Sequence, residues 1–392
     1  MKILDLQIKR NISLVYIDEL NSIVDSSQNK FNVHVPKDVK AASFGVIPSF
    51  IQFFATTIRK EKCSKLIMPF SNFDELEKYI EVEFVYPFTV LAWNLEIVDS
   101  KGADLKNPLA TISQKYFSKL EFLQVKILRS LPLYSFDHDI IQRGLSRFFY
   151  DSNYKLVYQD QLEFNLHPIF KKLALAHNVK DNRNTIAPII GDLTEIIYEL
   201  FKNTHEHART NIKGAFYFPN VRNVTLRILR KKKTSYLDDD ELPESVKEYF
   251  RSNLPLTEQS DLIMLEISVL DSGPGLVSRI SNKEDLSEYT LQEELQLTKE
   301  CLLKHKTSSS TYLAPVKGEG LDKVMQLLDR KGFLRIRTGR LDLIRNFISN
   351  PYVPTKDLNE IVLNDYLSNS GDLKEHALVA GTLHTFYYPI GA

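Results

Sequence analysis

The spacing of hydrophobic and polar residues divides the first part of the chain into short strands and helices. Apolar runs rich in β-branched and aromatic residues predict strands, and apolar residues that recur every three or four positions predict helices. Residues 1–105 are therefore expected to form a small α/β domain. Its predicted strands are 31–36, 65–70 and parts of 83–98, its predicted helices are 43–60 and 73–80, and its aromatic residues Phe50, Phe53, Phe54 and Trp93 have the spacing of core residues.

The next part of the chain, residues 106–182, has a mostly helical pattern. The segment YFSKLEFLQVKILRSL at 116–131 is an example. We interpret this region as a helical connector between two domains.

The remainder, residues 183–392, combines long helices with long strands. Its predicted helices are 187–208 and 320–331, and its predicted strands are 213–219, 222–230, 262–270, 333–338 and 381–390. This content predicts the α/β class, as an α/β sandwich in which one mixed sheet is covered by helices on one face.

Composition narrows the class of partner. The 392 residues contain 50 Lys+Arg and 50 Asp+Glu, so net charge gives no reason to expect nucleic acid or an anionic membrane. Only two cysteines are present, Cys63 and Cys301, which fits a reducing compartment. No apolar run approaches the roughly 18 residues of a membrane span, and charges interrupt the N-terminal apolar residues. We expect a soluble, cytoplasmic protein.

One helical segment, ELFKNTHEHA at 199–208, carries an unusual polar column. Glu199, Asn203 and His207 are spaced i, i+4 and i+8, so their side chains stack over successive turns beside an apolar stripe. Such a column is either a solvated row on the helix surface or the floor of a site.

Three glycine-containing segments follow this helix. In VLDSGPGL, a strand runs into Asp271 and then Gly273 and Gly275, an arrangement that suits recognition of an amino group on a flat ring. In KGEGLDKV, glycines open a helix whose free N–H groups form a phosphate site. The last segment, AGTLHTFYYP at 380–389, leads into the closing strand. Each segment alone is weak, but their order is informative.

Together these segments resemble the motifs of the GHKL superfamily of ATP-binding domains, which have the Bergerat fold. The superfamily includes type II topoisomerases, MutL proteins, sensor histidine kinases and anti-sigma-factor kinases. The likeness covers about residues 183–390 and rests on ELFKNTHEHA, DSGPG, GEGL and the terminal GT. It implies that the bound ligands are ATP and Mg²⁺.

The resemblance implies a role for each matching residue. Asn203 matches the Mg²⁺-binding asparagine, and Glu199 matches the general base of the hydrolysing branches. Asp271 matches the aspartate that binds the adenine amino group, and Thr382 matches a threonine near adenine. The remaining matches are to backbone close to the nucleotide or to phosphate contacts in the ATP lid: Gly273, Gly275, Lys306, Lys317, Gly318, Gly320 and Leu321.

The sequence departs from simpler members of this family in three places. The polar insertion at 230–252 is interpreted as a solvated loop, 276–317 is expected to be a long lid with a helix at 289–306, and 340–380 has no assignment. A sensor histidine kinase is disfavoured, because the upstream histidine His138 lacks the following proline of a phospho-accepting site.

Several functions stay open at this level. The first is a Mg-dependent ATPase whose lid closure acts as a conformational switch, with Glu199 supporting hydrolysis. The second is an anti-sigma-type serine/threonine kinase acting on a partner protein, and the third is a nucleotide-sensing module with negligible turnover. A protein partner is expected through the N-terminal region or the lid, and a homodimer is compatible with the family.

Overall fold

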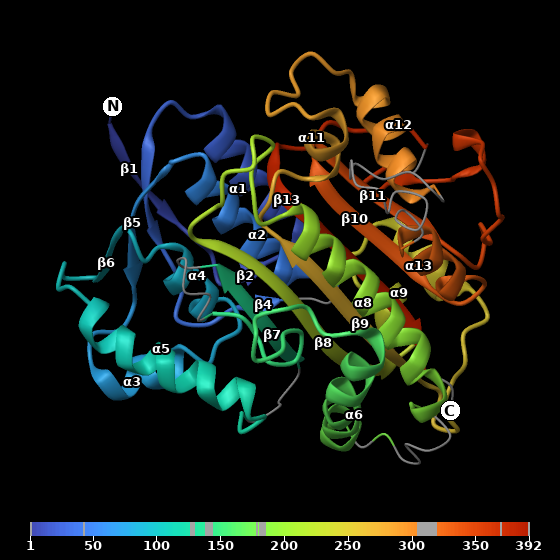
Figure 1. Ribbon diagram of the computed structural model, residues 1–392, viewed down its shortest axis with the longest axis horizontal. Helices are drawn as coiled ribbons and strands as arrows, with labels where there is room; N and C mark the ends of the chain where they lie inside the picture. Colours follow the sequence, from blue (N-terminus) through green and yellow to red (C-terminus); the bar gives the residue numbers. More distant parts are fainter. Residues whose placement is uncertain are drawn as a thin grey trace.

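The computed structural model describes residues 2–41, 44–125, 130–137, 144–177, 179, 186–303, 320–368 and 371–390. The described residues form a mixed α/β structure with a four-stranded parallel sheet, a seven-stranded antiparallel sheet and a two-stranded parallel pair (Figure 1). None of the helices in these ranges has the length and apolar character that a membrane span requires.

The N-terminal elements form a parallel sheet of four strands in the order β1-β3-β5-β6. The strands are β1 (Ile3–Gln7), β3 (Lys30–His34), β5 (Cys63–Met68) and β6 (Glu96–Asp99), and the short strands β2 (Asn11–Ile12) and β4 (Lys40–Ala41) pair separately. The helices of this part are α1 (Leu14–Ser26), α2 (Val46–Arg59), α3 (Phe73–Tyr79), α4 (Val85–Leu91) and α5 (Lys106–Glu121). Parallel neighbours need such crossover helices.

The sequence prediction for 83–98 is partly wrong. Only β6 is a strand, and the apolar run before it forms α4, all of whose residues are buried. A helix buried on every side has no polar face, so its sequence looks like that of a buried strand. Trp93 is also not a core residue, since it is 37% exposed, whereas Phe50, Phe53 and Phe54 are fully buried as predicted.

The larger sheet has seven strands in the order β12-β11-β10-β13-β9-β8-β7. Its strands are β7 (Ser130–Asp137), β8 (Asn220–Lys232), β9 (Asp261–Asp271), β10 (Phe333–Gly339), β11 (Leu341–Asn346), β12 (Asn364–Asp365) and β13 (Val379–Pro389). Every pairing in it is antiparallel, so the prediction of a mixed sheet is wrong on this point.

The edge strand β7 comes from the region that was predicted to be helical. Helix α5 ends at Glu121, and residues 130–137 pair with β8 over eight positions. Seven consecutive residues of β7 are buried, and this continuous burial hides the alternation that would mark a strand. The predicted strand 213–219 is not formed either, and only an isolated bridge joins Thr210 to Phe216.

Helices cover both faces of the large sheet, not one face as predicted. On one face lie α6 (Gln159–Ala176), α8 (Ile190–His207) and α13 (Gly320–Leu328); Figure 1 shows α8 crossing in front of β8 and β9. Helix α2 lies on the other face. Just before it, the N–H of Phe44 donates to Oε2 of Glu266 in β9, and Gly45 lies beside Ser268 of the same strand. Because side chains alternate along a strand, Asp271 points to the opposite face, toward α8.

Among the described residues, the remaining helices are η1 (Ala187–Ile189), which opens the predicted helix 187–208, and five that lie in the segments the sequence left as insertions. These five are α9 (Thr234–Leu237), α10 (Glu244–Arg251), α11 (Leu276–Ser281), α12 (Leu291–Leu302) and η2 (Leu358–Glu360). The insertion at 230–252 is not a solvated loop, because α10 buries Val246, Tyr249 and Phe250 in the core. The helix predicted at 289–306 is present as α12, with 304–306 outside the described residues, and the unassigned segment 340–380 supplies β11 and β12.

Candidate functional site

Two of the glycine-containing segments meet helix α8, one at Glu199 in its middle and the other at its C-terminal end. A Cβ placed on Gly320, the first residue of α13, would lie 2.3 Å from Oε2 of Glu199. A Cβ on Gly273 would lie 2.6 Å from the Cα of Ala208, which caps α8. Ala208 comes nine positions after Glu199, or about 13 Å along the helix axis. The segments around Gly320 and Gly273 therefore lie against the two ends of the polar column.

The fourth segment contacts the aspartate directly. Gly381 has a φ of +71°, and a Cβ on it would lie 1.9 Å from the carbonyl oxygen of Asp271. The next residue, Thr382, donates its backbone N–H to Oδ1 of Asp271 at 3.3 Å. Only glycine allows the last strand to approach Asp271 this closely, since another residue would be strained at this φ and would collide with backbone.

The Asp271 carboxyl is held by backbone and stripped of water. Oδ1 also accepts from the N–H of Gly273 at 2.9 Å, and no hydrogen bond to Oδ2 is found within the described residues. The side chain is 8% exposed, and this burial raises its pKa to about 6, although the two N–H donors and Arg222 oppose the shift. Because Oδ2 has no partner among the described residues, it can accept a hydrogen bond from a ligand.

Gly275 faces the end of β10. With a φ of +88°, it would place a Cβ 3.0 Å from Oγ1 of Thr338. The same hydroxyl accepts from the N–H of Leu276 at 3.1 Å and lies 3.3 Å from the hydroxyl of Thr382. Thr338 therefore joins the glycine turn to the closing strand, a role that no sequence motif predicts.

At the other end of the column, Glu199 is a partly desolvated acid. Its side chain is 19% exposed, and Nζ of Lys202 lies 4.0 Å from Oε2. Burial raises the pKa of Glu199, while Lys202 and Lys323 oppose the shift. A carboxylate with a raised pKa is a stronger base than an exposed one, which is the property that a general base requires.

Asn203 and His207 complete the column. Both are half-buried. The Asn203 amide makes no hydrogen bond to any described residue, so its oxygen is available to a ligand. His207 lies at the end of α8, where its carbonyl accepts a hydrogen bond from Arg279, an arginine of α11 that also donates to the carbonyl of Thr210. Arg279 thereby fixes the C-terminal end of the helix against the glycine turn.

Most of the residues predicted to contact phosphate lie outside the described part of the chain. These are Lys306, Lys317 and Gly318, and His138 lies outside it as well. Leu321 is 9% exposed and belongs to the hydrophobic core, so its side chain anchors α13 and only its backbone can face a ligand.

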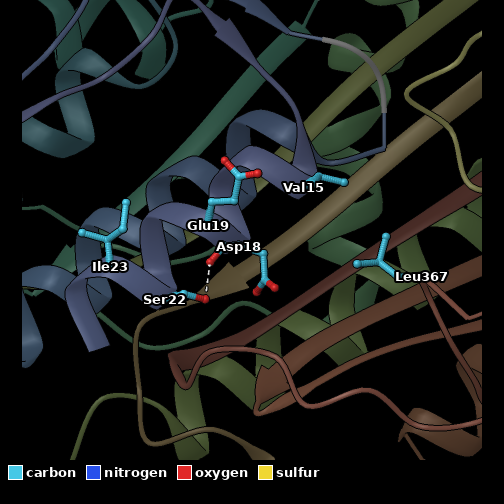
Figure 2. A pocket seen from close by; sticks show the side chains of 6 residues that line it. All are labelled: Val15, Asp18, Glu19, Ser22, Ile23 and Leu367. Carbon is cyan, nitrogen blue, oxygen red and sulfur yellow. Dashed lines mark hydrogen bonds between the residues drawn. The ribbon is translucent and has the colours of Figure 1, made fainter. Parts of the chain in front are cut away.

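A separate groove of about 450 Å³ lies on α1 (Figure 2). It is lined by Val15, Asp18, Glu19, Ser22, Ile23 and Leu367. None of the predicted site residues lines it. Its best-placed carboxylate, Asp18, is already engaged by Arg337 at 3.4 Å and by His376 at 3.3 Å. We therefore place the candidate site at Asp271 and α8.

Comparison of the chain with protein-family models, with curated proteins and with solved structures finds no match. In the described part of the chain, no group of three or more His, Cys, Asp or Glu side chains is arranged to hold a metal ion.

Proposed function

We propose that the protein binds Mg·ATP between α8 and the large sheet, in a Bergerat-type site, and hydrolyses it. The observation that carries the proposal is the convergence of four separate sequence segments. Gly320 contacts Glu199, Gly273 contacts Ala208, and Gly381 and Thr382 contact Asp271. If Glu199, Asn203 and His207 were only a solvated row on the helix surface, there would be no reason for these segments to gather beside them.

Asp271 supports recognition of adenine. Its Oδ2 is the available acceptor for an amino group on a purine ring, and a carboxylate cannot donate to the carbonyl that guanine carries at the same position. Gly273, Gly275 and Gly381 leave backbone without side chains around this acceptor. Their missing Cβ atoms let the backbone pack against Ala208, Thr338 and the Asp271 carbonyl, and so gather these segments around the acceptor.

Asn203 and Glu199 support the chemistry at the phosphate end. Asn203 offers an amide oxygen, and Mg²⁺ commonly takes one or two protein ligands together with phosphate oxygens. The metal, when bound, would neutralise phosphate charge. Glu199, four residues away on the same face of α8, is the carboxylate in position to orient a water molecule and accept its proton.

The test uses the full chain with γ-labelled ATP and Mg²⁺. We expect the wild type to release phosphate, Glu199→Gln to bind ATP but release none, and Asn203→Ala to lose Mg-dependent binding. Glu163→Gln, which changes an exposed glutamate of α6, is the control and should match the wild type.

Other outcomes of the ATP experiment would point to a different function. Label transferred to a second protein, with no free phosphate, would replace hydrolysis by phosphotransfer. ATP bound without turnover would indicate a nucleotide sensor. Failure of the wild-type protein to bind ATP would overturn the proposal.

A further inference from the structure

Helix α2 of the N-terminal part lies against the back of the large sheet and contacts β13 where this strand begins, at the proposed adenine site. Gln52 donates from Nε2 to the carbonyl of Ala380 at 3.1 Å. One turn later, Oγ1 of Thr56 accepts from the N–H of Ala380 at 2.9 Å. Both side chains are almost fully buried, so water does not compete for these bonds.

The last residue of α2 reaches the other half of the same site. Arg59 donates from Nη2 to the carbonyl of Ser272 at 3.0 Å, and its guanidinium lies 3.5 Å from the centre of the Tyr217 ring. Burial lowers the pKa of Arg59 to about 10, so the group is still charged at neutral pH. The bond to Ser272 is therefore charge-assisted and stronger than a neutral one.

These contacts hold the two residues that flank the closest approach in the site. Gly381 and Asp271 approach closely because Gly381 has no Cβ. Ala380 precedes Gly381, and Ser272 follows Asp271. Gln52, Thr56 and Arg59 are spaced i, i+4 and i+7, so they lie on one face of α2. A single helix thus fixes both backbone segments that set the position of the Asp271 carboxyl.

We propose that α2 is a built-in positioning element of the nucleotide site, with Thr56 and Arg59 as its positioning residues, so that nucleotide occupancy and the N-terminal part are coupled. The inference rests on the proposed function. Both residues lie outside the segment that carries the ATP-binding motifs. Because coupling is reciprocal, the docking of α2 should favour adenine binding, and adenine binding should tighten the docking of α2.

The first test compares variants of α2 in the full chain for binding of adenosine and of Mg·ATP by calorimetry. Thr56→Val removes the acceptor of Ala380 and should weaken adenosine binding about fivefold, the equivalent of one neutral hydrogen bond. Arg59→Met should weaken it about tenfold or more, and Arg59→Lys should restore part of the loss because it keeps a charged donor.

Thr57→Val is the matched control. Thr57 is buried in the same helix, and its hydroxyl donates to the carbonyl of Phe53 at 2.9 Å, within α2. This variant should bind adenosine as the wild type does. If α2 acts only on the adenine end, each variant should weaken adenosine and ATP binding by the same factor and leave the Mg²⁺ dependence of ATP binding unchanged. General loosening of the fold would also change the Mg²⁺ dependence.

A second test needs no variant. The amide proton of Ala380 is held by Thr56, so saturation of the wild-type protein with adenosine should slow hydrogen exchange at Ala380 and in the last turn of α2. The inference is overturned if adenosine binds but leaves this exchange unchanged, or if Thr56→Val and Arg59→Met bind it as tightly as Thr57→Val. If neither adenosine nor ATP binds to the wild type, the proposed function itself fails, and the inference fails with it.

Discussion

In the proposed site Asp271 is the residue that would bind the adenine amino group, and its ionisation gives a direct prediction. Its pKa of about 6 describes the ligand-free site. An adenine amino group donates to the ionised carboxylate and therefore stabilises that form. Adenosine should bind most tightly above pH 6, and its affinity should fall as the pH drops through 6, by up to about tenfold per pH unit well below it. Calorimetry between about pH 5 and pH 8 measures this directly.

Asp271→Asn is the control for this pH dependence. The Asn side chain keeps an oxygen that can accept from the N–H groups of Gly273 and Thr382, but it cannot ionise. The variant should bind adenosine more weakly at neutral pH by about 1–3 kcal/mol, with an affinity that no longer changes with pH. A wild-type affinity that stays constant over the same range would remove Asp271 from the adenine site.

At this scale the sequence predicts the residues that carry local motifs and misses those that reach the site from elsewhere. Asp271 and Gly273 stand in one short segment, so their association can be read from spacing alone. Arg59 and Thr338 each lie in an unremarkable helix or strand, and only the packing of α2 and the pairing of β10 with β13 bring them to the site. No local pattern encodes such contacts.

The elements around the site depend on close approach at three glycines, and the partners that a new Cβ would meet differ in how far they can move. At Gly381, the Cβ meets the Asp271 carbonyl at a positive φ, so Gly381→Ala should lower the free energy of unfolding by about 3 kcal/mol or more. At Gly273, the Cβ meets the backbone of Ala208, and we expect a loss of about 2 kcal/mol.

At Gly320, the Cβ would meet only the end of the Glu199 side chain, which can rotate away. Gly320→Ala should therefore cost less than about 1 kcal/mol of stability but slow hydrolysis by displacing the carboxylate. Gly191→Ala, at an open position in the first turn of α8, is the control and should stabilise by up to about 1 kcal/mol. Denaturant titration measures the free energy of unfolding of all four alanine variants. Equal losses of stability for Gly381→Ala and Gly320→Ala would contradict the predicted order.

Complete burial removes the polar face that marks a helix or strand, and elements such as α8 and β9 were assigned correctly where a polar face or another signal marked them. Helix α8 and strand β9 lie close to their predicted bounds, because α8 keeps one polar face and β9 is long and ends at a glycine turn. Strand β7 and helix α4 were misassigned because nearly every residue in them is buried. Without a polar face, periodicity cannot distinguish a helix from a strand.

The segments 1–105, 106–182 and 183–392 share one hydrophobic core. The hydrophobic core is one cluster that runs from Leu6 to Ile390. The back of the large sheet also carries buried charged groups that the N-terminal part covers: Arg335 pairs with Asp342 and donates to Ser49 of α2 at 3.0 Å. Sequence reading assigned the boundaries 105 and 182 from changes of pattern, and pattern carries no information about which surfaces pack together.

This packing predicts the behaviour of fragments. A chain of residues 183–392 contains every motif of the proposed ATP site, but it lacks β7, which pairs with β8, and α2, which covers the back of the sheet. Removing α2 exposes apolar surface and leaves the Ala380 amide without its acceptor, Thr56. We therefore expect the fragment to lack a cooperative unfolding transition and to bind no ATP, as measured by circular dichroism and calorimetry.

A fragment of residues 106–392 separates the two causes. It restores the β7 edge and still lacks α2, so it should recover part of the sheet's stability without recovering tight adenosine binding. If 183–392 unfolded cooperatively and bound adenosine as tightly as the full chain, the ATP site would be an independent domain, and the contacts of α2 with Ala380 and Ser272 would be packing without consequence for the ligand.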